Sequence, residues 1–388
     1  MNSWLLTSSS ATPIRCRCPP VSCATQRSIR LVADLETTEM QCVRRFRTLA
    51  WVGALWGLLM PVGASAQSPQ FGPASSPQGI ERTLPKLDAA QWVERMRADP
   101  CARTYTGALV VSAASGAMTS SRMWHACIDG LPVVRVEPQT GVPRVVFRHG
   151  DEVRTFNLQA RTVRVEPREP ARGFPAVPLL SGAAVSQHYG VKLLGSERVA
   201  GAIADGVAFV PQDAWRFGYR FWIERDSGLV LKLQTVGPDG RMLEQTAFSQ
   251  LDLKSPVRAE ELLQSVQSFQ GFQIEMPSIR RTAAEAEGWV LRQIPPGFVS
   301  LGCFLRQASP KGDTAPVLQC VYSDGLASVS VFLEDLSPQR PADKAQTASI
   351  GATHLWAQRV KGDAWTTVVG EVPLATLRAF AHHIERLR

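Results

Sequence analysis

The sequence predicts an α+β protein of two domains, with an antiparallel sheet in the first and a smaller α+β unit in the second. Residues 105–253 hold short runs rich in β-branched and aromatic residues, and Gly, Asp and Pro turn signals separate these runs. A charged and polar stretch at 255–288 interrupts the pattern, and a second group of apolar runs occupies 289–388. Sequence repeats of about 20–50 residues are absent, which excludes a solenoid or a propeller.

A secretion signal lies inside the sequence rather than at its first residue. Residues 40–66 combine three arginines, an apolar run from Leu49 to Val62, and the small residues Ala64-Ser65-Ala66 at the expected cleavage point. The apolar run is shorter than the roughly 18–20 residues that a membrane-spanning helix needs. We therefore expect a Sec-type signal peptide that is cleaved after Ala66 and directs the protein to the periplasm.

The segments on either side of this signal are polar and irregular. We interpret residues 1–39 as a spurious extension, with translation starting at Met40, and residues 67–86 as a flexible leader rich in Pro, Gly, Ser and Gln. Residues 1–66 contain seven basic and three acidic side chains, so the net charge of +8 falls to +4 for residues 67–388. A charge this small does not indicate nucleic-acid binding.

Four cysteines follow the expected cleavage point. They are Cys101, Cys127, Cys303 and Cys320, one close pair in each half of the chain. An even number of cysteines in an oxidising compartment predicts disulfide bonds. Of the three possible connectivities we expect the simplest, Cys101–Cys127 and Cys303–Cys320. Since no CxxC motif is present, we expect these bonds to be structural rather than catalytic.

The first domain is predicted at 87–254 and opens with an amphipathic helix over 88–99. Six short strands between 105 and 166, joined by tight turns, predict an antiparallel meander. Residues 167–180 contain four prolines and are expected to form an irregular loop, with a short helix over 181–192. The remaining strands of this sheet are expected at 207–211, 219–224, 229–236 and 243–253.

The stretch at 255–288 is predicted to be a linker with a short helix at 259–265. The second domain, at 289–388, is expected to contain five strands and a C-terminal helix over 374–387. The sequence has no GxSxG elbow, HExxH zinc helix, P-loop or dinucleotide fingerprint. An enzyme, a metal site or a bound cofactor is therefore not indicated. The five strands are expected at 299–307, 318–323, 327–334, 353–360 and 364–369.

Seven motifs follow one another along the chain. They are YTG at 105–107, DEVR at 151–154, ERVAG at 197–201, WRFGYRFWIERDSGLVL at 215–231, DGRMLEQ at 239–245, YSDGLASVSVFLE at 322–334 and VVGEVP at 368–373. In this order they resemble the motifs of the RseB/MucB family of periplasmic sigma-E regulatory proteins, and the resemblance extends over residues 88–387. It implies that the first domain is similar to LolA and LolB, an unclosed antiparallel β-barrel with helices across its mouth.

The resemblance implies binding rather than catalysis. Proteins of this family bind the periplasmic part of a transmembrane anti-sigma factor of the RseA/MucA type, shield it from the site-1 protease and so keep the envelope-stress sigma factor captive. The resemblance also implies that the half-barrel senses lipopolysaccharide or lipoprotein acyl chains, and that their binding releases the anti-sigma factor. The alternative is a periplasmic lipid or lipoprotein carrier of the LolA/LolB type, although a simple carrier needs no second domain.

Alternating strand positions supply candidates for the lining of an acyl-chain cavity, with an ordinary core as the alternative. The proline-rich loop is a candidate gate or an uninvolved surface loop. Three arginines are candidates for contact with an acidic peptide or lipid phosphates, or are solvated surface residues. The cavity candidates are Leu109, Val111, Met123, Val145, Phe147, Phe221, Ile223 and Leu231, the gate candidates are Phe174, Leu179 and Leu180, and the arginines are Arg216, Arg220 and Arg225.

The mode of partner binding follows from the expected state of the partner. A segment that is disordered before binding can add a strand to an exposed sheet edge. The sequence leaves a homo-oligomer open.

Overall fold

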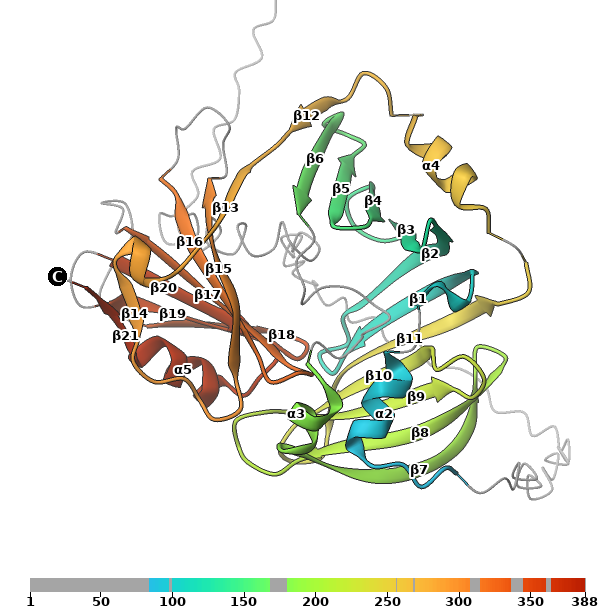
Figure 1. Cartoon of the computed structure of the whole chain (residues 1–388), viewed down its shortest axis with the longest axis horizontal. Coiled ribbons are helices and arrows are strands. Elements are labelled where there is room, and N and C mark those ends of the chain that lie inside the picture. Colours follow the sequence, from blue (N-terminus) through green and yellow to red (C-terminus); the bar gives the residue numbers. More distant parts are fainter. Residues whose placement is uncertain are drawn as a thin grey trace, which may run out of the picture.

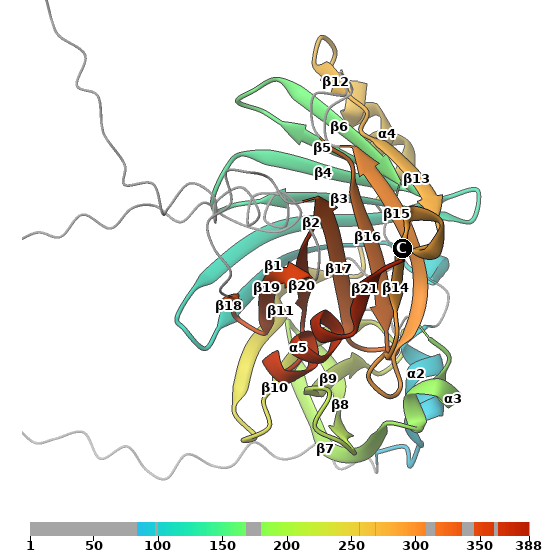
Figure 2. The ribbon, with the colours of Figure 1, turned by 90° about the vertical axis from the view of Figure 1, so that its left-hand side faces the viewer.

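The computed structural model describes residues 84–97, 100–167, 180–255, 257–267, 269–307, 315–335, 345–360 and 364–387. These residues form a 12-stranded sheet, a 7-stranded sheet and a small two-stranded pair. The first sheet curves from β7 to β12, and the second sheet stands opposite it (Figure 1). A view at right angles shows the strands of the second sheet lying across the curved first sheet (Figure 2).

The first sheet is an antiparallel meander that does not close. Its strand order is β12-β6-β5-β4-β3-β2-β1-β11-β10-β9-β8-β7, and β12 against β6 is its parallel pair. Because β7 and β12 both lie at edges, the predicted unclosed sheet is confirmed. Its strands are β1 (Tyr105–Ala113), β2 (Met118–Ile128), β3 (Leu131–Pro138), β4 (Arg144–His149), β5 (Glu152–Asn157), β6 (Thr162–Pro167), β7 (Tyr189–Val199), β8 (Ala202–Pro211), β9 (Gly218–Glu224), β10 (Val230–Val236), β11 (Met242–Asp252) and β12 (Gln273–Glu275).

Helix α2 (Ala89–Met96) begins where the sequence predicts, at an Asp88 cap. The Asp88 carboxylate accepts the backbone N–H of Gln91 over 2.8 Å, and the Gln91 side chain accepts the backbone N–H of Asp88 over 3.0 Å. This capping box satisfies two N–H groups that a helix start leaves unpaired. Trp92, Val93 and Met96 form the buried face, which packs near α3 (Gly182–Ser186).

The second domain is a smaller α+β unit, as predicted. Its sheet has the order β13-β15-β16-β17-β20-β19-β18, and α5 (Leu374–His382) packs against β19 and β20. The chain then forms β21 (Ile384–Arg386), which pairs with β14 (Trp289–Leu291), so the predicted helix ends earlier than expected. The strands of the sheet are β13 (Ser278–Thr282), β15 (Val299–Gln307), β16 (Val317–Ser323), β17 (Ser328–Asp335), β18 (Gln346–Ile350), β19 (Thr353–Val360) and β20 (Ala364–Gly370).

The stretch predicted as a linker contributes to both domains. Helix α4 (Ala259–Gln267) packs against β2 and β3, β12 extends the first sheet, and β13 starts the second. The predicted helix over 181–192 is also shorter, because β7 begins at Tyr189. The polar composition of this stretch predicted a connector, but the apolar residues of α4 pack against β2 and β3.

Both predicted disulfide bonds are present. Cys101 lies in the short 3₁₀ helix η1 (Pro100–Ala102) and is bonded to Cys127 on β2. Cys303 and Cys320 lie directly opposite each other on β15 and β16 and are also bonded. Each bond therefore fixes a local part of one domain, and neither joins the two domains.

Candidate functional site

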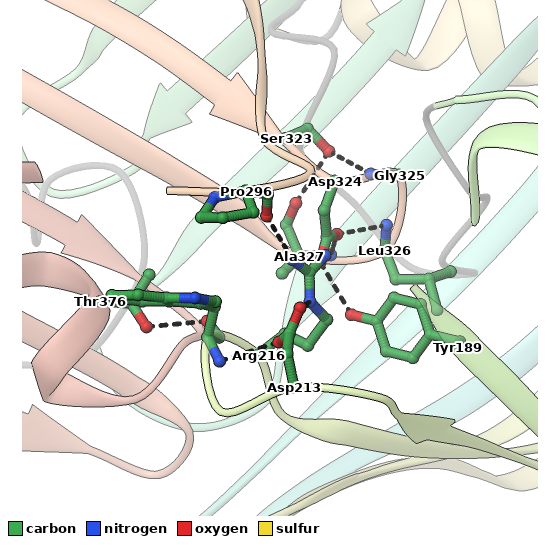
Figure 3. Close-up of polar contacts among 11 residues, drawn as sticks. Tyr189, Asp213, Arg216, Pro296, Ser323, Asp324, Gly325, Leu326, Ala327 and Thr376 are labelled. Carbon is green, nitrogen blue, oxygen red and sulfur yellow. Dashed lines mark hydrogen bonds and ion pairs between the residues drawn. The ribbon is translucent and has the colours of Figure 1, made fainter. Parts of the chain in front are cut away.

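The two domains meet at a buried ion pair between Arg216 and Asp324 (Figure 3). Arg216 follows β8 in the turn that leads to β9, and Asp324 lies in the turn between β16 and β17. Nη1 of Arg216 donates to Oδ2 of Asp324 over 2.7 Å, and both side chains are 0% exposed. Salt screens such a pair much less than it screens a surface pair.

The guanidinium of Arg216 has partners from both domains. Its Nε donates to the Asp213 carboxylate over 3.0 Å, and its Nη2 donates to the carbonyl of Pro296 in the second domain. The guanidinium carbon lies 5.7 Å from the centre of the Tyr189 ring and 5.2 Å from that of Phe298. Arginine suits this position because its planar cation can donate in several directions and stack on aromatic rings at once.

Both carboxylate oxygens of Asp324 likewise have several hydrogen-bond donors. Its Oδ2 also accepts the hydroxyl of Tyr189 over 2.9 Å. Its Oδ1 accepts the backbone N–H groups of Leu326 and Ala327 over 3.0 Å and 2.7 Å. Backbone donors and an arginine together stabilise a carboxylate that is buried from solvent.

The turn that carries Asp324 also packs closely on the first domain. Gly325 has a φ of +104°, and a Cβ at this position would lie 2.6 Å from a side-chain atom of Val185 on α3 and 3.2 Å from one of Leu180. A side chain is therefore excluded by both backbone conformation and space. Helix α2 fixes the same region, because Arg97 donates to the carbonyl of Leu180 over 2.8 Å.

The environment of the junction raises the pKa of two tyrosines and of Arg216. Burial raises the pKa of Tyr189 well above 10, and the charge of Asp324 raises it further, so its hydroxyl remains a donor. Burial alone lowers the pKa of Arg216, but the hydrogen bond with Asp213 and the charge of Asp324 outweigh it, so that pKa is raised. Burial likewise raises the pKa of Tyr219, whose hydroxyl has no hydrogen-bond partner among the described residues.

Apolar packing continues across the junction. Trp92 of α2 and Phe209 of β8 belong to the same buried cluster as Leu377 and Phe380 of α5. The hydroxyl of Thr376 adds a hydrogen bond of 2.8 Å to the carbonyl of Trp215. A single core thus extends through both domains, so they form one packed body.

This junction corrects one predicted role. The sequence predicts Arg216 at the surface, either as a contact for an acidic partner or as a solvated residue, but its guanidinium is buried and each of its three nitrogens donates to a partner. Arg225 instead binds Asp205 over 2.6 Å and Ser196 over 2.8 Å, and so ties neighbouring strands together. Arg220 is half-buried, with bonds of 3.4 Å to Gln234 and to a turn carbonyl. The three arginines do not form one basic patch.

A second region of interest is the face of the first sheet that is turned toward the second domain. We call it the inner face. Strand register places Met123 opposite Val136, Val136 opposite Val146, and His125 opposite Val134 on this face. Glu166 ends one of these rows, and Arg306 of the second domain approaches its carboxylate to 3.5 Å.

The register corrects two cavity candidates. Val145 and Phe147 point to the outer face, where they are buried beneath Leu262 of α4. The prediction that they continue the stripe of Leu109 is therefore wrong, because alternate residues of a strand point to opposite faces. Strand β4 presents Val146 to the inner face instead.

The other candidates divide between core and open surface. Leu109, Met123 and Leu231 are buried together in one cluster. Phe221 and Ile223 are buried in the core that both domains share. Beside Val111, other half-buried valines remain partly open on the inner face, and the sequence did not single them out. Their positions follow from that of Met123, because side chains alternate between the two faces along β3, β4 and β5. They are Val134, Val136, Val146 and Val153.

A groove of about 510 Å³ lies at the β7 end of the same face. Val191 and Leu193 supply its apolar wall, and Lys86 stands in its lining. The gate candidates Phe174 and Leu179 lie outside the described residues, whereas Leu180 is half-buried at the junction. The full lining is Lys86, Leu87, Asp88, Ala89, Ser186, Tyr189, Val191 and Leu193.

The ranges that the structure describes contain neither a metal-binding cluster nor a membrane-spanning helix. No group of three or more His, Cys, Asp or Glu side chains within them is arranged to hold a metal ion. None of the helices in those ranges combines the length and the apolar character needed to cross a membrane.

Comparison with known protein families gives the decisive observation. The model of the MucB/RseB N-terminal domain matches residues 88–266, and that of the MucB/RseB C-terminal domain matches residues 283–385. The chain belongs to the MucB/RseB family. Together the two matches cover both sheets except strands β12 and β13, and they include Arg216 and Asp324 of the junction.

Individual MucB/RseB proteins are similar over most of the chain. The sigma factor AlgU regulatory protein MucB of Pseudomonas aeruginosa is 29% identical over 303 residues, which are 76% of this chain and 90% of that protein. The sigma-E factor regulatory protein RseB of Escherichia coli K12 is 23% identical over 269 residues, 69% of this chain and 81% of that protein. The named functions of these relatives are regulatory.

Solved structures show the same two-domain fold. A crystal structure of MucB in complex with MucA(peri) matches with a TM-score of 0.59 and 28% identity, over 78% of this chain and 100% of that chain. The complex structure of Pseudomonas aeruginosa MucA/MucB matches with a TM-score of 0.61 and 26% identity, over 77% and 99%.

Proposed function

We propose that this protein is a periplasmic negative regulator of an envelope-stress response of the sigma-E type. A signal peptide at 40–66 exports it. In the periplasm it binds the periplasmic segment of a transmembrane anti-sigma factor of the RseA/MucA type and shields that segment from the site-1 protease. The observation that carries the proposal is the likeness over both domains to MucB, which has been solved in complex with MucA(peri).

The junction gives this proposal a physical basis. An extended partner gains affinity from a surface that is already ordered, because less conformational entropy is lost on binding. The buried pair of Arg216 and Asp324 and the shared core hold the two sheets in one arrangement. A partner that contacts both sheets therefore meets a preformed surface.

The inner face supports the second half of the proposal, release by a lipid. Val136 and Val146 offer half-buried apolar surface, and an open, shallow groove lies beside Val191. Arg148 and Arg164 lie on the same face by register, and Arg164 also pairs with Glu166 over 3.3 Å. Apolar side chains accept an acyl chain, and guanidinium groups suit a phosphate, which is the chemistry of lipopolysaccharide or a lipoprotein anchor.

A protease-protection assay tests both halves together. The exported protein, the periplasmic segment of the host's anti-sigma factor and the site-1 protease are mixed, and cleavage of the segment is followed with time. We expect the protein to slow cleavage and lipopolysaccharide to restore it. Equal cleavage rates with and without the protein would refute shielding, whereas protection that lipopolysaccharide does not reverse would refute lipid release.

A further inference from the structure

One run of chain forms an edge of both sheets. Strand β12 (Gln273–Glu275) ends the first sheet with β6 as its neighbour, and β13 (Ser278–Thr282) ends the second with β15 as its neighbour. Met276 and Pro277 alone separate them. Figure 1 shows β12 and β13 as successive arrows that bridge the two sheets. In the part of the chain that the structure describes, no strand pairs with the other side of either one. We call residues 273–282 the bridging edge.

On the open side of this edge, backbone N–H and C=O groups face away from the neighbouring strand. The N–H of Gln273 donates to the carbonyl of Arg161 over 2.9 Å, toward β6. Successive residues of a strand direct their N–H and C=O groups to opposite sides, so those of Ile274 point away from β6. Such unpaired groups are a template for an incoming strand.

The side chains of the edge combine apolar and basic character. Ile274 is 61% exposed and Met276 is 60% exposed, which is unusual for large apolar residues. Arg280 and Arg281 follow on β13, and both are exposed. Arg280 has one acidic neighbour, Glu287, at 2.6 Å. A complementary strand would carry apolar residues opposite β12 and acidic residues roughly 13–17 Å further along, opposite β13.

The other free edges fit an incoming strand less well. Strand β7 ends the first sheet on its other side, but α2 and α3 pack near it. It also carries the exposed charges of Lys192, Glu197 and Arg198, which discourage pairing. Strand β18 belongs to the second sheet alone. The bridging edge alone among these spans both domains.

We propose that the bridging edge is where an extended, partly acidic segment of the anti-sigma factor adds a strand to both sheets at once. The inference rests on the proposed function and assigns the surface that performs it. The proposal also explains why the junction matters for binding. Strands β12 and β13 can accept one continuous strand only while Arg216 and Asp324 keep the two sheets aligned.

Lysine substitutions on the edge test the assignment. The variant I274K/M276K places charges where the apolar part of the partner strand would lie, and both side chains are exposed enough for the fold to tolerate them. The matched control is Met118→Lys, at a residue that is 68% exposed at the start of β2. The probe is a synthetic peptide of the anti-sigma factor's periplasmic segment, and its affinity is measured by fluorescence anisotropy.

We expect the double variant to lose at least tenfold in affinity and the control to bind as the unaltered protein does. Equal affinity in the folded double variant would overturn the bridging edge as the binding surface. Loss of self-association with unchanged peptide affinity would overturn it in favour of a second copy of this chain. Absence of peptide binding by the unaltered protein would contradict the proposed function instead, so the two failures are distinguishable.

Hydrogen exchange gives an independent readout of strand addition. Bound peptide should slow exchange of the Ile274 amide, whose N–H points to the open side of β12. The Gln273 amide already bonds to Arg161 and should change little. Unchanged exchange at Ile274 with the peptide bound would overturn strand addition there.

Discussion

At the scale of single residues, Arg216 and Asp324 depend on each other. Removing two opposite charges from water is costly, and their attraction and hydrogen bonds offset this cost only while both are present. Both side chains are fully buried, so solvent cannot replace a lost partner of either group. The pair therefore specifies one arrangement of the domains more than it adds stability.

Asp324→Ala should lower the free energy of unfolding by about 3–5 kcal/mol, because it removes the buried one of the two carboxylates that pair with the buried guanidinium of Arg216. The double variant R216M/D324L should recover much of this loss, since apolar side chains of similar size fill the space. Urea unfolding of the single and double variants measures both. A cost below about 1 kcal/mol for Asp324→Ala would contradict the assigned role.

His125 makes the stability of the protein depend on pH. It is buried and stacked on Tyr105 with ring centres 4.7 Å apart. Burial lowers its pKa below the ordinary 6.5, although a hydrogen bond to the Arg103 carbonyl acts in the opposite direction. Below about pH 6.5 the unfolded state then binds more protons than the folded state, so stability falls as the pH falls.

The variant His125→Phe keeps the stacking surface and removes this titration. We expect the free energy of unfolding to decrease less between about pH 6.5 and 5 in the variant than in the unaltered protein. Chemical unfolding at several pH values measures the slope. The same slope in both proteins would exclude His125 as its source.

Val146 tests the lipid-binding role of the inner face. Val146→Glu and Val111→Glu each place a charge on half-buried apolar surface, where an acyl chain would have to cover it. Covering a charge costs several kcal/mol, so lipopolysaccharide affinity should fall at least tenfold. Leu158→Glu, at a residue 38% exposed, is the control. Full lipid affinity in both folded inner-face variants would exclude this surface.

Residue-scale predictions succeeded where local pattern was sufficient. Asp88 and the four cysteines could be assigned because caps and local disulfides depend on nearby sequence. Arg216 could not, since its burial depends on a domain that begins about 70 residues later in the chain. The face to which Val145 points could not be assigned either. A shift of one residue in the phase of a strand exchanges the side chains on its two faces.

At the scale of elements, the two disulfides stabilise local loops. The bonded cysteines are separated by 26 residues in the first domain and 17 in the second. Closing loops of this size restricts the unfolded chain by about 3 kcal/mol on the chain-entropy account. The bond near η1 also ties the connection after α2 to the sheet.

Replacing each cysteine pair by serine should therefore lower the free energy of unfolding by about 2–4 kcal/mol. The loss should be slightly larger for C101S/C127S than for C303S/C320S, because the first loop is longer. Denaturant titration under oxidising conditions measures both. Stabilities equal to that of the unaltered protein would show that the bonds contribute nothing to folding.

The strands were largely predictable and the connecting segments were not. Alternating β-branched residues and turn signals defined β1 to β6 and β9 to β11 closely, whereas only the second half of β8 and no strand at β7 were expected. Helix α4 and strand β12 were assigned to a linker, because their polar composition hides a few apolar residues that pack on β2 and β3. Whether a short amphipathic segment is ordered depends on a surface that lies elsewhere in the chain.

At the scale of the whole molecule, the two sheets share one core and one bridging edge. Residues from α2, β8 and α5 meet in a single cluster, and β12 and β13 extend the two sheets in one run of chain. The sequence indicated two domains and their order. It could not indicate that they pack as one body, because the contacts involve residues far apart in sequence.

The affinity of residues 67–388 for the periplasmic segment of the host's anti-sigma factor tests the central claim most directly. A fluorescently labelled segment is titrated with the protein, with and without lipopolysaccharide. We predict a dissociation constant of about 1 μM or lower, which lipopolysaccharide raises at least tenfold. No binding at about 100 μM protein, with lipopolysaccharide bound all the same, would contradict the regulator and favour a lipid carrier.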